Sequence, residues 1–311
     1  MSHLSKRIKT KAKLFFALSR TTHGVLDIAL PAFCALLWLG AFPSLKIIIL
    51  GLITVFGAYT AVYALNDLVG YRIDRAKMQG TDSYQGYSVE ASDLRHPIAQ
   101  KLLSVKAAVA WIGFWLLVTI IGGYLLNPIT LWILLVGAVL EVIYCLLLKV
   151  TYLRVIVSGI VKACGPIAAV FVVAPTPSPY FLTMIFLWVF LWEIGGQNIP
   201  ADWTDLEEDK RANSKTLPIR FGLKTSGRIV LVTLVLTIML GAYLFYLSPA
   251  PFTLPAVIVS VLIGLYLLLM PALRLCSNTA PEFSAKLFDK SSHYPVALLV
   301  LMVVLLIVSK L

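Results

Sequence analysis

The chain contains nine apolar stretches, each close to the length that crosses a lipid bilayer as a helix, about 20 residues. They are residues 25–42, 45–65, 105–126, 129–148, 155–174, 180–198, 228–247, 251–271 and 294–309. Because 59% of the 311 residues are hydrophobic and 13% are charged, too few polar side chains remain to cover a water-soluble surface. The sequence therefore predicts an all-α, polytopic membrane protein, a bundle of nine transmembrane helices forming one domain of residues 1–311.

Positive charge gathers on one side of this predicted bundle. With the N-terminus in the cytoplasm, every Lys and Arg falls in a cytoplasmic segment except Lys46 and Lys310 outside and Lys162 within a span. By the positive-inside rule, we expect an integral membrane protein, in the inner (plasma) membrane if the cell is bacterial, with cytoplasmic N-terminus and long polar loops. The net charge of +11 then indicates contact with anionic lipids and no nucleic-acid partner. Residues 1–24 are predicted to be a basic segment on the inner leaflet.

Two acid-bearing segments follow apolar spans on this cytoplasmic side, in predicted loops at residues 66–104 and 202–227. The candidate site residues are Asn66, Asp67 and Asp74 in the first segment, and Asp202, Asp205 and Asp209 in the second, together with Asn198 just before it. A spacing of seven places Asp67 and Asp74 on one face if the helix continues past Asn66. In the second segment Asp202, Asp205 and Asp209 have the spacing i, i+3, i+7 of one helix face, although a kink is expected at Pro200. Two acidic stripes on the same side can converge on one central cavity.

Facing groups of carboxylates suit Mg²⁺, which takes one or two carboxylates together with waters and phosphate oxygens. Such ions neutralise a diphosphate and make it a better leaving group. The alternative is that these acids are solvated loop charges, balanced by Lys210, Arg211 and Arg75. Two such segments on the same side, each with one-face spacing, favour the metal site.

The acidic segments also follow recognisable patterns. The first fits NDxxDxxxD except at Gly70, which stands where the middle aspartate is expected, and the second fits DxxxD at Asp205 and Asp209. Tyr144 and Lys149, five residues apart, lie at the end of the fourth span and directly after it. In these features, and over nearly its whole length, the chain resembles the UbiA-type intramembrane prenyltransferases. Arg95-His96-Pro97 stands where that family usually has Arg-Pro.

The resemblance implies Mg²⁺-dependent transfer of a polyprenyl group from its diphosphate to a small acceptor, an aromatic quinone precursor, within the membrane. It implies catalytic and metal-binding roles for Asp67, Asp74, Asp205 and Asp209, with Asp202 as a further metal ligand. The substrate-binding residues would be Asn66, Arg72, Tyr144, Lys149, Asn198 and Lys215. The stretch from Arg75 to Arg95 is longer than the family's usual link, and we expect it to form a helical cap over the cavity.

Other functions remain open at this point. A UbiA-type terpene cyclase and prenyl transfer to a non-aromatic acceptor fit the same motifs. A cation-binding transporter is disfavoured, because its ionisable residues should lie near the bilayer midplane, whereas these acids gather at one surface. Within the spans, Lys162 is predicted to pair with Glu141 or Glu193 and fix helix packing. Alternatively, Asp27 and Glu193 deprotonate or orient an acceptor.

Overall fold

The computed structural model describes residues 3–77 and 94–311, and side chains from residue 11 onward. Within these residues all regular structure is helical, and nine helical segments are long and apolar enough to cross a membrane. The segments are Thr21–Leu39, Leu45–Lys77, Val105–Leu126, Pro128–Lys149, Arg154–Val173, Pro179–Thr204, Leu217–Leu247, Thr253–Ser277 and Pro281–Val308. The predicted all-α membrane fold is therefore confirmed, and the chain is an integral membrane protein.

The α-helices of the described residues have the following bounds. In the first half they are α1 (His3–Leu18), α2 (Thr21–Asp27), α3 (Ala29–Leu39), α4 (Leu45–Lys77), α5 (Val105–Leu126), α6 (Pro128–Leu146), α7 (Arg154–Val173) and α8 (Pro179–Trp192). In the second half they are α9 (Ile199–Thr204), α10 (Leu206–Arg211), α11 (Leu217–Leu247), α12 (Thr253–Gly264), α13 (Met270–Ser277), α14 (Pro281–Ser292) and α15 (Tyr294–Val308). A 3₁₀ turn covers Leu147–Lys149, and π-helical turns cover Glu193–Asn198 and Leu265–Leu269.

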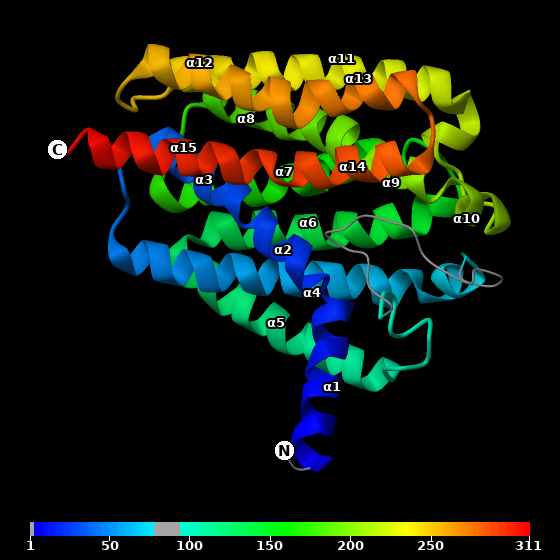
Figure 1. The fold of residues 1–311 in the computed structure, drawn as a ribbon. Helices are drawn as coiled ribbons and strands as arrows, with labels where there is room; N and C mark the ends of the chain where they lie inside the picture. Colours follow the sequence, from blue (N-terminus) through cyan, green and yellow to red (C-terminus); the bar gives the residue numbers. More distant parts are fainter. Residues whose placement is uncertain (1–2, 78–93) are drawn as a thin grey trace.

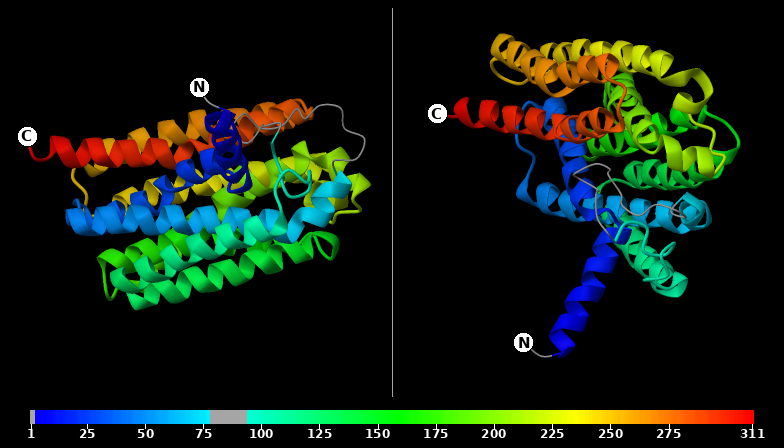
Figure 2. Two further views of the ribbon diagram at one scale, coloured as in Figure 1. Left: turned by 90° about the horizontal axis from the view of Figure 1, so that it is seen from below. Right: turned by 45° about the vertical axis from the view of Figure 1, so that its right-hand side comes forward.

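The spans lie side by side with their connections at two opposite ends (Figure 1). One end holds α10 and the C-terminal part of α4; because it carries Asp67, Asp74, Asp202, Asp205 and Asp209, we call it the acidic end. The C-terminus of the chain lies at the other end. Helix α1 projects sideways from the bundle (Figures 1 and 2), as expected for a helix that rests on a membrane surface.

Local sequence explains where several spans begin. Ser104 and Asn127 cap α5 and α6, their side-chain oxygens accepting hydrogen bonds from backbone N–H groups at 3.2 Å and 2.9 Å. Pro128 and Pro179 occupy the first helical positions of α6 and α8, where no N–H donor is needed. Gly40 ends α3 in the left-handed conformation, with φ of 59°, and packs so closely on the backbone of Pro249 that a side chain would not fit.

The acidic motifs lie on helices and not in the loops predicted at 66–104 and 202–227. Helix α4 has 33 residues, about 50 Å at 1.5 Å per residue, so it extends well past a hydrocarbon core of about 30 Å. Its extension carries the first motif, while α9 and α10 carry the second, and α11 already begins at Leu217. Most of the predicted cap, residues 78–93, lies outside the described residues.

Directly before Pro200 the helix widens into the π-helical turn Glu193–Asn198. Proline has no N–H to give to the carbonyl of Gly196, and the Ser291 hydroxyl on α14 donates to that carbonyl instead. The helix therefore continues to Thr204 and is interrupted only at Asp205. The wide turn buries both Glu193 and Asn198, and such turns are frequent at functional sites.

Candidate active site

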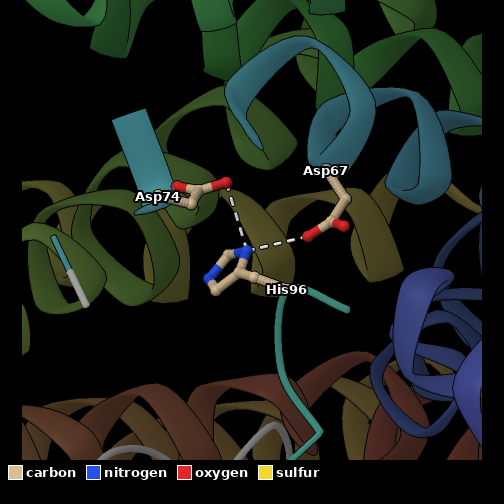
Figure 3. Close-up of side chains that lie close together, drawn as sticks. All are labelled: Asp67, Asp74 and His96. Carbon is tan, nitrogen blue, oxygen red and sulfur yellow. Dashed lines mark hydrogen bonds and ion pairs between the residues drawn. The ribbon is translucent and has the colours of Figure 1, made fainter. Parts of the chain in front are cut away.

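The first acidic motif forms a compact cluster with His96. The Nδ1 atom of His96 lies 2.8 Å from Asp67 Oδ1 and 3.2 Å from Asp74 Oδ2 (Figure 3). Asp67 is 3% exposed, and its second oxygen, Oδ2, is buried without a hydrogen-bond partner in the described part of the chain. Burial lowers the pKa of the His96 imidazole, but Asp74 and Asp67 raise it by more, so that its pKa is about 9. In the absence of a metal ion, His96 is therefore a cation that balances two buried carboxylates.

The second acidic motif is balanced by two other cations. Lys77 Nζ lies 2.6 Å from Asp209 Oδ1, and Arg154 Nη1 lies 3.5 Å from Asp202 Oδ1. Asp205 Oδ1 is buried without a hydrogen bond to any described residue. Burial raises the pKa of the Asp205 carboxyl to about 6, since Lys77 only partly offsets it while Asp209 raises it further. This motif carries more buried negative charge than its direct partners neutralise.

The two motifs meet around the C-terminal end of α4. Lys77 interacts electrostatically with Asp74 of the first motif as well as with Asp205 and Asp209 of the second. The segment before α5 joins them again, because Arg95 donates to Glu208 Oε1 at 2.6 Å while the next residue, His96, contacts the first motif. The convergence expected from the sequence therefore occurs, with a lysine between the two sets of acids.

On the side of the acids that faces the interior of the bundle, amide, hydroxyl and guanidinium groups form a hydrogen-bond network. Asn66 Nδ2 donates to Glu141 Oε1 at 2.5 Å, and Asn198 Nδ2 donates to the Tyr144 hydroxyl at 2.9 Å. Arg154 also donates to that hydroxyl, and its guanidinium lies 4.1 Å from the centre of the Tyr144 ring. This network links the second motif, through Arg154, to the interior of the bundle.

A cavity of about 180 Å³ lies beneath this network, between α4, α5, α6, α7 and the π-helical turn. Its polar part includes Asn66, Tyr144 and Asn198, and its deeper part is mostly aliphatic. A second cavity, of about 270 Å³ and lined almost entirely by apolar side chains, lies towards the opposite end. Val55, Leu134 and Gly165 line both cavities, so the two adjoin.

Three ionisable residues inside the spans, Asp27, Lys162 and Glu193, lie close together beside the first cavity. Lys162 Nζ lies 2.6 Å from Asp27 Oδ2 and 4.0 Å from Glu193 Oε2, and its ammonium lies 5.5 Å from the Trp192 ring. The close partner of Lys162 is therefore Asp27, whereas the sequence favoured Glu141 or Glu193. Glu193 accepts a hydrogen bond from Ser158 at 2.6 Å through Oε1, while its buried Oε2 accepts none from the described residues.

Three of the predicted substrate-binding residues do not join this site. Arg72 is exposed and stacks on the neighbouring Tyr71 ring, five residues from Asp67 and off the acidic face of α4. Lys149 and Lys215 are exposed, and the backbone N–H of Lys215 donates to the carbonyl of Leu148. Asn66, Tyr144 and Asn198 do line the cavity.

Sequence reasoning missed three cations of the site. Lys77 is seven residues after Gly70 and three after Asp74, so its helical spacing was available as a signal. The sequence signal for His96 was weaker: it lies between Arg95 and Pro97, where the resembling family usually has Arg-Pro without a residue between them. Arg154 follows Tyr144 by ten residues, beyond the 3₁₀ turn, and no local spacing connects the two.

Comparisons with known proteins agree with this architecture. A sequence model described as the UbiA prenyltransferase family matches residues 28–292. No curated protein matches the chain by sequence. Among solved structures, a UbiA homologue from Archaeoglobus fulgidus bound to DMAPP and Mg²⁺ superposes with a TM-score of 0.70 at 18% identity, covering 94% of this chain and 99% of that one.

Two further structures share the fold. A UbiA homologue from Aeropyrum pernix K1, solved without ligand, has a TM-score of 0.68 at 16% identity and covers 93% of this chain and 98% of its own. A digeranylgeranylglyceryl phosphate synthase has a TM-score of 0.63 at 19% identity, with 97% of this chain and 100% of that one covered. These likenesses extend along nearly the whole of each chain.

Proposed function

Because the chain belongs to the UbiA prenyltransferase family, and is therefore a prenyltransferase, we propose that it transfers a polyprenyl group from its diphosphate to a small aromatic acceptor, a quinone precursor. The observation that carries this proposal is the convergence of two carboxylate sets around Lys77, above a largely apolar cavity. The proposal also puts the acidic end in the cytoplasm, where the positive-inside rule would have it.

The donor set fits Mg²⁺. Asp67 Oδ2 and Asp205 Oδ1 are buried oxygens without hydrogen bonds to described residues, which is costly unless a ligand satisfies them. Asp67 and Asp74 would hold an ion at the first motif, and Asp202, Asp205 and Asp209 at the second. When bound, Mg²⁺ neutralises the diphosphate and makes it a better leaving group. A structure of a UbiA homologue with DMAPP and Mg²⁺ supports this assignment.

Lys77 and Arg154 would bind the diphosphate together with the metal ions. Lys77 and Arg154 are the basic side chains that pair directly with the second motif, and they are free to turn towards phosphate oxygens once the ion takes their place on the acids. They replace Arg72, Lys149 and Lys215 in the role that the sequence suggested. Tyr144 and Asn198 would orient the diphosphate end of the prenyl chain.

The cavities suit an allylic cation and its tail. Tyr59 and Tyr63 line the first cavity, and aromatic rings of this kind would stabilise an allylic cation. The prenyl tail would continue past Gly165 into the second, apolar cavity. Glu193 Oε2, buried and without a hydrogen-bond donor among the described residues, is the acceptor best placed to take the proton that a prenylated acceptor releases.

The test is to identify the product. Purified protein in lipid nanodiscs is incubated with Mg²⁺, a labelled prenyl diphosphate and a panel of aromatic, glycerol phosphate and sugar phosphate acceptors, and products are identified by mass. We expect a prenylated aromatic acid, released diphosphate, and no product in EDTA. The variants Asp67→Asn and Asp205→Asn should lose at least about 100-fold in turnover, the effect of removing one strong electrostatic contact.

Three outcomes oppose parts of the proposal. A cyclic hydrocarbon formed without acceptor would make the protein a terpene cyclase, and transfer only to a glycerol phosphate would change the acceptor class. If no prenyl diphosphate is consumed with any acceptor, and Mg²⁺ with a prenyl diphosphate does not raise the Tm, the enzymatic role itself is wrong.

A further inference from the structure

We propose that His96 is a direct metal ligand in this chain, so that the first motif is a mixed centre of two carboxylates and one imidazole that favours Mn²⁺ over Mg²⁺. The inference rests on the proposed function, because it concerns the ion that would serve the diphosphate. It departs from the all-oxygen set that the aspartate signature implies.

Gly70 adds no side chain to the first motif. Residue 70 lies between Asp67 and Asp74 on the same face of α4, and an added Cβ there would come within 3.0 Å of Asp74 Oδ2. Position 70 therefore adds no third carboxylate to this face of the helix. The segment before α5 brings the His96 ring to the two carboxylates that are present, with Nδ1 directed at both (Figure 3).

The three side chains lie close enough together to hold one metal ion. One atom each from Asp67, Asp74 and His96 can be chosen so that all three lie within 4.8 Å of one another. Asp67 Oδ2 supplies an independent indication, because it is buried, belongs to a side chain that is only 3% exposed, and has no hydrogen-bond partner among the residues described. An ion held by Asp67 would satisfy that oxygen.

The backbone at His96 is also held in an uncommon conformation. Its φ is 52°, in the left-handed region, which costs a residue other than glycine on the order of 1 kcal/mol. The following Pro97 disfavours the ordinary helical alternative, and the adjacent Arg95 is fixed to Glu208 at 2.6 Å. Two neighbouring constraints thus hold the imidazole against the acids.

Ligand chemistry then sets the metal preference. Carboxylates alone suit Mg²⁺, whereas an imidazole nitrogen strengthens binding of first-row transition ions much more than binding of Mg²⁺. Mn²⁺ accepts both oxygen and nitrogen ligands and serves phosphate chemistry in the same way. We therefore expect a Mn²⁺ affinity at least tenfold above that for Mg²⁺.

The decisive measurement is electron spin echo envelope modulation of Mn²⁺ bound to the purified, full-length protein without substrate. A coordinated imidazole gives a ¹⁴N modulation, and labelling with ¹⁵N-histidine should convert it to the ¹⁵N pattern, a result that needs no variant. His96→Asn, which also tolerates the left-handed backbone, should remove the modulation and weaken Mn²⁺ binding at least tenfold. His96→Asp supplies an oxygen ligand in place of the nitrogen. This variant should bind Mg²⁺ at least as tightly as the wild type does, with a lower ratio of Mn²⁺ affinity to Mg²⁺ affinity.

The outcomes separate this inference from the proposed function. Bound Mn²⁺ without nitrogen modulation, or modulation that survives in His96→Asn, overturns the ligand role of His96 and leaves the carboxylate site standing. If neither Mn²⁺ nor Mg²⁺ binds, with or without a prenyl diphosphate, both the inference and the metal-dependent function are wrong.

Discussion

Replacing Lys77 by methionine should strengthen Mg²⁺ binding in the absence of substrate. The Lys77 ammonium lies 2.6 Å from Asp209 Oδ1 and interacts with Asp74 and Asp205, so it competes with a metal ion for the same negative charge. Unit charges about 4 Å apart interact by about 1 kcal/mol in water and about 4 kcal/mol at an effective dielectric constant of about 20. The side chain of Lys77 is 14% exposed and that of Asp209 is 1% exposed, which points to the middle of this range. A gain of about 2 kcal/mol corresponds to about 30-fold in affinity.

Isothermal titration of the nanodisc-embedded protein with Mg²⁺ measures this effect directly. Lys224→Met, which removes an exposed lysine from α11, is the matched control and should leave the affinity unchanged. The metal-free Lys77→Met protein should also melt at a lower temperature, because buried acids lose a partner, and should gain more in Tm from Mg²⁺ than the wild type. Unchanged or weaker Mg²⁺ binding in Lys77→Met would refute the idea that this lysine stands in for the metal.

Three further predictions concern other parts of the site. Arg154→Met should lower the free energy of unfolding by about 3 kcal/mol, since it leaves a buried carboxylate unpaired, and Mg²⁺ should recover part of the lost Tm; the exposed Arg228→Met should do neither. Because the pKa of Asp205 is raised to about 6, its carboxyl is protonated below that pH, so Mg²⁺ affinity should rise as the pH increases through about 6; an affinity flat between pH 5 and 7 contradicts this. Gly165→Leu fills the junction of the two cavities, where an added Cβ already comes within 3.2 Å of the Tyr59 hydroxyl, and should abolish transfer of long prenyl chains while retaining DMAPP; equal loss for both donors would argue against the tail path.

The sequence sufficed for the features that depend on local composition. The nine spans follow from apolar length, and the shared face of Asp67 and Asp74 follows from helical periodicity, although α4 continues further than its apolar part alone indicated. The structure agrees with both because a bilayer and a helix impose these constraints on any chain.

The features that escaped prediction depend on contacts between distant segments. The π-helical turn persists because Ser291, 95 residues from Gly196, satisfies a carbonyl that Pro200 leaves without a donor. Arg154 on α7 pairs with Asp202 on α9, which lies 48 residues later in the chain. Lys77 lies 132 residues before its partner Asp209, and the positive-inside rule counts it only as a topological charge.

The most direct test of the account is a double-mutant cycle between the two motifs. Mg²⁺-dependent binding of an inert prenyl thiolodiphosphate is measured for wild type, Asp67→Asn, Asp205→Asn and the double variant. If both motifs act on one diphosphate, each single change should weaken binding strongly and the double variant should lose little more, giving a coupling energy above about 1 kcal/mol. A shared site would be contradicted if the losses in binding free energy of the two single variants add up to the loss of the double variant, or if either single substitution leaves the binding affinity unchanged.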